Sequence, residues 1–264
     1  MQNRAIQRLL GLGGVRRYAR SMSKVRERLN PYFRKHEQSD VRSERMIQVA
    51  VEQLGLTLDF LDFAIEDYEA ANAKYRAEHE QFMEDVRFNE SGGETKRTHS
   101  ATDVEERRRG YFLLHYRIDT FYVFARIVLD DVAVLLKYAL APSPVDLGNR
   151  HKGIAKHLPT IAVAKGLTGY EDVIARGNEV AAVIKDFRDD YVVHRSGNRP
   201  RATRSFTWNV GEEETRINYG LSYPREGEEV PFVQSTDLLK LRDKLDRYVD
   251  AVLDLVEPLP VAGA

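Results

Sequence analysis

The sequence of 264 residues contains no cysteine and no long uninterrupted apolar run. The absence of cysteine excludes disulfide scaffolds, thiolate metal sites, iron–sulfur clusters and thiol nucleophiles. No stretch reaches the roughly 18 consecutive apolar residues that predict a transmembrane helix, so we expect no membrane partner. Hydrophobic residues make up 42% of the chain and charged residues 31%, a balance that excludes a wholly disordered protein. These features fit a globular protein, which we expect to be cytoplasmic.

Most short motifs that mark enzymes are also missing from the sequence. There is no glycine-rich loop followed by Lys and Ser or Thr, no GxGxxG after a predicted strand, and no HExxH pair. His151 and His157 lie close together, but Lys152 and Lys156 flank them. Neighbouring cations disfavour a bound metal ion. We therefore expect neither a metal site nor a cofactor.

The near-neutral charge of the chain hides an excess of positive charge at its start. Lys and Arg number 40 against 41 Asp and Glu, but residues 1–45 hold twelve basic and four acidic residues, a net charge of +8. We expect residues 1–39 to form a basic arm and residues 40–264 to form one domain. Such an arm can contact nucleic acid or simply be solvated. A mitochondrial targeting segment has a similar composition, but the glycines of 11–14 interrupt the amphipathic pattern.

Apolar residues recur at three- and four-residue steps in five segments, which predicts five helices. The segment 104–140 has the widest apolar stripe and is expected to be central. Residues 206–210 and 217–223 alternate with period two and predict a β-hairpin at about 205–223. The fold class expected is all-α, an antiparallel helical bundle with one appended β-hairpin. The helices are expected at about 40–87, 104–140, 149–165 with a break near Pro159, 170–195, and from Ser235 or Thr236 onward.

One segment, Phe187-Arg-Asp-Asp-Tyr-Val-Val-His-Arg195, combines residues suited to phosphodiester chemistry. Arg188 can bind a phosphate by paired hydrogen bonds, and His194 can transfer a proton near neutral pH. The ten residues from Arg195 contain four cations and no acid, as expected for contacts to an RNA backbone. These candidate RNA-binding residues are Arg195, Arg199, Arg201 and Arg204.

Arg188, the polar residue Asp189 after it, and His194 after five intervening residues resemble the Arg–His signature of HEPN domains (higher eukaryotes and prokaryotes nucleotide-binding). Residues 116–130 also resemble the central helix of HEPN-like proteins of unassigned function. The resemblance implies an all-α bundle that forms a homodimer, in which two Arg–His motifs meet. It further implies a metal-independent endoribonuclease, often a toxin or antiviral effector, with RNA as substrate and with Arg188, His194 and Asp189 as catalytic residues. Its partners could include an antitoxin or another regulatory protein.

Other readings of the same residues stay open. On an ideal helix Arg188 and His194 lie about 120° apart, so a shared cleft in a symmetric dimer would be needed to bring such groups together. Arg188 could instead form an ordinary ion pair, and His194 could pack in the core. The chain would then be a catalytically silent HEPN-like module that binds nucleotide or protein, or a structural helical dimer. A polar stripe on the central helix could brace the bundle or orient the site; it consists of His115, Asp119, Tyr122, Arg126 and Asp130.

Overall fold

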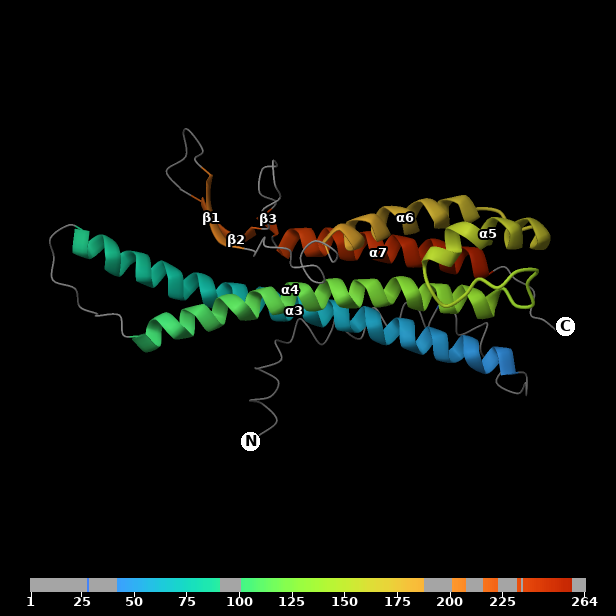
Figure 1. Cartoon of the computed structure of the whole chain (residues 1–264), viewed down its shortest axis with the longest axis horizontal. Helices are drawn as coiled ribbons and strands as arrows, with labels where there is room; N and C mark the ends of the chain where they lie inside the picture. The colour runs from blue at the N-terminus through green and yellow to red at the C-terminus, as the bar shows by residue number, and fades with distance from the viewer. Residues whose placement is uncertain are drawn as a thin grey trace. The chain divides into compact units, whose positions relative to one another are not determined.

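The computed structural model describes Arg28 and the residue ranges 42–90, 101–187, 201–207, 216–222, 232–233 and 235–257. This part of the chain is mainly α-helical, which confirms the all-α prediction. Among its helices, none combines the length and the apolar content that crossing a membrane would require. The helices, shown in Figure 1, are α3 (Arg42–Glu90), α4 (Ala101–Ala139), α5 (Lys152–Lys165), α6 (Tyr170–Phe187) and α7 (Ser235–Val256).

The chain divides into two compact units, and the boundary between them falls within α3, α4 and the first turn of α7. The first unit comprises residues 1–63, 121–187 and 239–264, and the second comprises 64–120 and 188–238.

In the first unit, segments of α3, α4, α6 and α7 pack side by side. The rings of Phe60 and Phe124 stack 5.0 Å apart and join α3 to α4. Lys244 Nζ on α7 lies 2.8 Å from Glu179 Oε1 on α6, and the two helices run together in Figure 1. The apolar stripes predicted from the sequence are buried here. Their buried members include Leu54, Leu58, Leu61, Phe121, Val128, Leu129, Val132, Leu135, Val180, Ile184, Leu245, Tyr248 and Val252.

A buried arginine links α7 to α3 within this unit. Arg242 Nε donates a hydrogen bond to Asp62 Oδ1 over 2.7 Å, and the same guanidinium contacts Asp246 one turn further along α7. Arg28, the one described residue of the predicted basic arm, forms ion pairs with three carboxylates in the last turns of α7 and directly after it. These carboxylates belong to Asp250, Asp254 and Glu257.

Helix α5 corrects one expectation from the sequence. It runs without a break from Lys152 to Lys165, although Pro159 lies inside it. Proline removes one backbone donor from a helix, which costs about 3 kcal/mol in a helix interior. Packing offsets this cost, because the side chains on both sides of the proline are buried: Ile154, Leu158, Ile161 and Ala162. Gly166 then ends the helix in the left-handed conformation, with φ of 68°.

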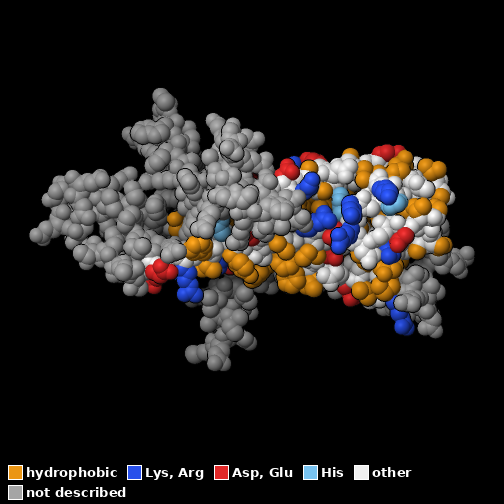
Figure 2. Space-filling view, in the orientation of Figure 1, with side chains coloured by type: hydrophobic (Ala, Val, Ile, Leu, Met, Phe, Trp, Pro, Cys, Tyr) orange, Lys and Arg blue, Asp and Glu red, His pale blue; other side chains and the backbone are white. Residues whose placement is uncertain are grey.

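Not all apolar side chains of α3 and α4 are covered in the described structure. Figure 2 shows hydrophobic side chains along the face where these two helices lie. Exposed apolar side chains at helical spacing mark a surface suited to contact with another molecule. Those in the first unit are Val49, Leu56, Phe60, Phe63, Val123 and Ile127.

The second unit contains the rest of α3 and α4, the first turn of α7 and a small antiparallel sheet. The strand order in the sheet is β1 (Arg201–Thr207), β2 (Arg216–Ser222), β3 (Phe232–Val233). Strand β1 pairs with β2 from Arg201 opposite Ser222 to Thr207 opposite Arg216. Residues 208–215, where the turn of the predicted hairpin falls, lie outside the described residues. The hairpin therefore stays a prediction, and β1 begins about four residues earlier than the sequence pattern indicated.

A half-buried carboxyl group on α4 gives the first unit a pH-dependent stability. Burial raises the pKa of Asp131 to about 6, the hydrogen bond from Thr57 lowers it, and the charge of Asp130 raises it. Thr57 Oγ1 donates that bond to Asp131 Oδ2 over 2.7 Å. Because the folded-state pKa lies above the unfolded value, the stability linked to protonated Asp131 is present below about pH 4 and is lost as the pH rises through about 6.

We expect Asp131→Asn to stabilise the protein by about 1 kcal/mol at about pH 7.5 and to have little effect at about pH 4.5. Asparagine cannot ionise, yet its carbonyl oxygen can still accept the hydrogen bond from Thr57. Urea unfolding of parent and variant at both pH values measures the difference. A stability difference of the same size at both values would show that ionisation of Asp131 is not its cause.

Candidate functional site

The end of α6 is fixed against α4 by an aromatic stack. Phe187, the last residue of α6, and Tyr122 of α4 have ring centroids 3.7 Å apart and ring planes only 10° apart. Both side chains are buried, with 7% and 5% of their surface exposed. Arg188, the first residue of the predicted Arg–His segment, follows Phe187 in the sequence.

The polar residues that follow Tyr122 on α4 form a brace inside the first unit. Arg126 Nη2 lies 3.1 Å from Asp130 Oδ1, one helical turn away. The same oxygen accepts a hydrogen bond from the backbone nitrogen of His151 over 2.9 Å. This part of the polar stripe therefore holds the start of α5 against α4. His115 and Asp119, the other members of the stripe, belong to the second unit.

His151 is a buried, neutral histidine. Burial lowers its pKa to about 4, the charge of Arg126 lowers it, and the charge of Asp130 raises it. Its ring meets the ring of Tyr248 edge-on, with centroids 5.8 Å apart. Neither His151 Nε2 nor the Tyr248 hydroxyl has a hydrogen-bond partner among the described residues. A histidine held neutral in this way is a packing residue at neutral pH rather than a proton donor.

Gly177 on α6 makes room for both of these rings. A Cβ atom at this position would lie 2.8 Å from His151 Nε2 and 2.9 Å from Tyr248 Cε2. We expect Gly177→Ala to destabilise the protein by about 1–3 kcal/mol through overpacking, although alanine normally stabilises a helix interior by about 1 kcal/mol relative to glycine. Chemical unfolding followed by circular dichroism measures this change.

Gly110 on α4 provides the matched control for that substitution. A Cβ atom there would lie 3.6 Å from the Tyr75 ring, an ordinary contact. Gly110→Ala is therefore expected to be neutral or stabilising. Equal stabilisation by both substitutions would contradict the close packing of Gly177 against His151 and Tyr248.

The structure also presents a basic surface at and just before α5. The sequence analysis treated these residues only as an unfavourable place for a metal ion. Residues 147–170 contain no acidic residue, and Arg150, Lys152 and Lys156 are exposed. Figure 2 shows Lys, Arg and His side chains together where α5 lies in Figure 1. The signal that could have identified this surface is the long acid-free run, since a solvated helix face usually mixes both signs of charge. Such a surface suits contact with a polyanion.

Most of the predicted site residues fall outside the described residues. Arg188, Asp189, His194, Arg195 and Arg199 belong to this group. Their predicted roles therefore stay predictions, and the structure gives no distance between Arg188 and His194.

The other two predicted RNA-binding residues, Arg201 and Arg204, lie on strand β1. Their backbones pair with Ser222 and Tyr219 of β2. Their side chains lie outside the description. Within the described part of the chain, no group of three or more His, Asp or Glu side chains is arranged to hold a metal ion.

Comparison with known proteins gives no family model, no curated protein and no solved structure that matches this chain.

Proposed function

We propose that the protein is a metal-independent endoribonuclease of the HEPN type, with Arg188 and His194 as its catalytic residues and Asp189 as the group that orients them. The observation that carries the proposal is the Arg–His segment of the sequence, which combines a guanidinium that can bind phosphate with an imidazole that can transfer a proton. It begins directly after Phe187, whose ring is stacked on Tyr122 of α4. A catalytic segment needs such a rigid base, because reacting groups must be held in a defined geometry.

The proposed reaction joins the RNA 2′-oxygen to the adjacent phosphorus and breaks the bond from phosphorus to the 5′-oxygen of the next nucleotide. His194 transfers a proton during this exchange, from the 2′-hydroxyl or to the departing 5′-oxygen. Arg188 stabilises the negative charge that develops on the phosphorus-bound oxygens. The products are a 2′,3′-cyclic phosphate and a 5′-hydroxyl.

Binding of the RNA strand is assigned to basic side chains that follow this segment in the sequence and to basic side chains of α5, which precedes it. The sequence places Arg195 and Arg199 after the motif, followed by Arg201 and Arg204 on β1. The exposed cations of α5 add a second basic surface in the first unit. Binding that depends on such contacts weakens with salt, by a log–log slope of about −0.7 for each neutralised phosphate on a single strand.

The enzyme is proposed to act as a cytoplasmic homodimer. On an ideal helix the six-residue step from Arg188 to His194 places the two residues about 120° apart, and a symmetric dimer can supply both groups to one cleft. A bundle with the two motifs in one shared cleft is the HEPN-like arrangement.

The experiment that tests the proposal is incubation of the full-length protein with mixed single-stranded RNA in EDTA, with the heat-denatured protein as control. We expect cleavage in EDTA by the native protein only. No cleavage at any protein concentration would reject the enzyme and leave a binding or structural role.

A further inference from the structure

A pocket of about 410 Å³ lies in the second unit, between the later part of α3 and the earlier part of α4. Helix α3 contributes Lys74 and Tyr75 to its lining, and α4 contributes Glu106, Arg109 and Arg117. None of these residues belongs to the Arg–His segment or to the basic surface of α5. The volume falls in the range that holds a small organic ligand.

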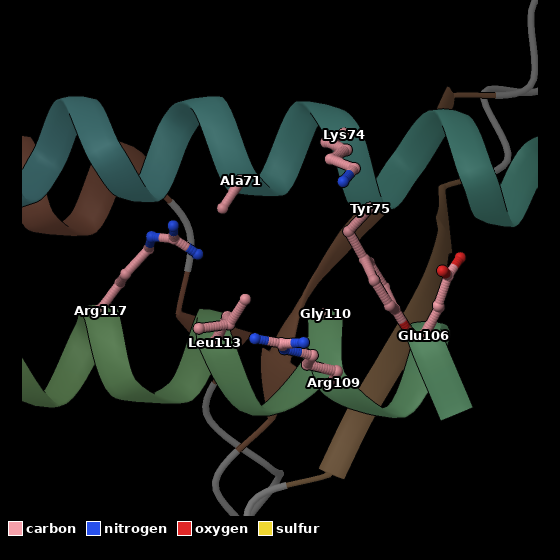
Figure 3. Close-up of a pocket in the computed structure, with 8 residues that line it drawn as sticks. All are labelled: Ala71, Lys74, Tyr75, Glu106, Arg109, Gly110, Leu113 and Arg117. Atoms are coloured by element: carbon pink, nitrogen blue, oxygen red, sulfur yellow. The ribbon is translucent and has the colours of Figure 1, made fainter. Parts of the chain in front are cut away.

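Three cations meet at this pocket, against one acidic residue in its lining. Figure 3 shows the Lys74 side chain reaching down from α3 and the Arg117 guanidinium reaching up from α4. Arg109 extends along the α4 side of the same space, and the Tyr75 ring crosses toward α4. Because the lining holds more positive than negative charge, it suits a bound anion.

The orientation of Arg117 is fixed from outside the pocket. Its Nε donates a hydrogen bond to Asp67 Oδ2 over 2.5 Å, and Asp67 is not part of the lining. A carboxylate at Nε fixes the plane of the guanidinium, and the outer N–H groups of its two terminal nitrogens can still donate to phosphate oxygens. Arg109 is exposed, and no ion pair joins it to an acidic side chain in the part of the chain that the structure describes.

We propose that this pocket binds a phosphate group, with Arg109 and Arg117 as its hydrogen-bond donors, Lys74 as a further positive charge and the Tyr75 ring as a wall for the organic part of the ligand. The phosphate could belong to a small phosphate ester or to an RNA strand, since both offer the same oxygens. The site does not depend on the proposed ribonuclease activity, because it uses different residues.

Isothermal titration calorimetry on the full-length protein tests the site with pyrophosphate as the probe, in buffer of about 50 mM salt. We expect saturable binding by the parent and at least a tenfold loss of affinity in Arg109→Gln, because a charge-assisted hydrogen-bond donor is removed. The control is Lys185→Gln, which removes the same charge from the exposed surface of α6. It is expected to bind within twofold of the parent. Circular dichroism confirms that both variants are folded.

Two further titrations identify the source of the phosphate. Competition by ribose 5-phosphate would assign the site to a small phosphate ester, and competition by a ten-nucleotide RNA alone would assign it to a strand. The proposal is overturned if pyrophosphate does not bind at concentrations up to about 5 mM. It is equally overturned if Arg109→Gln binds as well as the Lys185→Gln control. If the parent protein binds pyrophosphate but does not cleave RNA, the proposed function is rejected and the phosphate site is retained.

Discussion

Replacing Arg188 or His194 by alanine is expected to abolish RNA cleavage in EDTA and to leave the helical fold intact. His194 would transfer a proton in the displacement, a contribution of about a hundredfold or more. Arg188 would hold the phosphate and the charge that develops on it, with a comparable effect. Cleavage of mixed single-stranded RNA by parent and variants, with circular dichroism as the folding measurement, gives the comparison.

Lys185 supplies a matched control for Arg188→Ala, because its replacement also removes one positive charge from this part of the chain. It is an exposed basic residue in the last turn of α6, three residues before Arg188. Lys185→Ala should cleave RNA nearly as well as the parent, and Asp189→Asn should lose less activity than either catalytic variant. Parent-like cleavage by the Arg188 and His194 variants would reject the assigned chemistry. Unfolding of these variants would instead place both residues in the core, as the structural interpretation holds.

Tyr122→Ala is expected to lower the free energy of unfolding by about 3–5 kcal/mol, the loss typical of a large buried aromatic side chain. The substitution removes the ring that stacks on Phe187 and opens a cavity between α4 and α6. Because Phe187 precedes Arg188, we also expect RNA cleavage to fall. Urea unfolding followed by circular dichroism measures the stability, and the RNA assay measures the activity.

Two other tyrosine variants make this result specific. Tyr116 lies on the same helix but is 67% exposed. Tyr116→Ala should therefore change stability by no more than about 0.5 kcal/mol. Tyr122→Phe keeps the ring and should retain most of the stability. Equal losses from Tyr116→Ala and Tyr122→Ala would contradict the structural role of the Tyr122–Phe187 stack.

Much of the helical structure could be predicted from the spacing of apolar residues. The apolar stripe predicted for residues 104–140 is buried at its positions from Leu114 to Leu136. An apolar stripe of this length is removed from water only when it packs against other helices. The predicted break at Pro159 was wrong, since burial of the flanking residues outweighs the local cost of proline. Local preference indicates where a helix is weak, whereas tertiary packing decides whether it continues.

Fewer contacts of the candidate site could be predicted from the sequence. The ion pair of Arg126 and Asp130 follows directly from their four-residue spacing. The contact of Asp130 with the backbone of His151 does not, because it joins residues 21 positions apart. The pocket between α3 and α4 was missed for the same reason. Lys74 and Arg109 are unremarkable on their own helices, and only the pairing of the helices brings them to one cavity.

The chemistry of the RNA ends produced by the full-length protein in EDTA tests the central claim most directly. Mass spectrometry of a single cleaved oligonucleotide identifies both new ends. The account predicts a 2′,3′-cyclic phosphate on one fragment and a 5′-hydroxyl on the other, because the 2′-oxygen attacks the phosphorus. A 3′-hydroxyl with a 5′-phosphate, or an intact oligonucleotide, would contradict it.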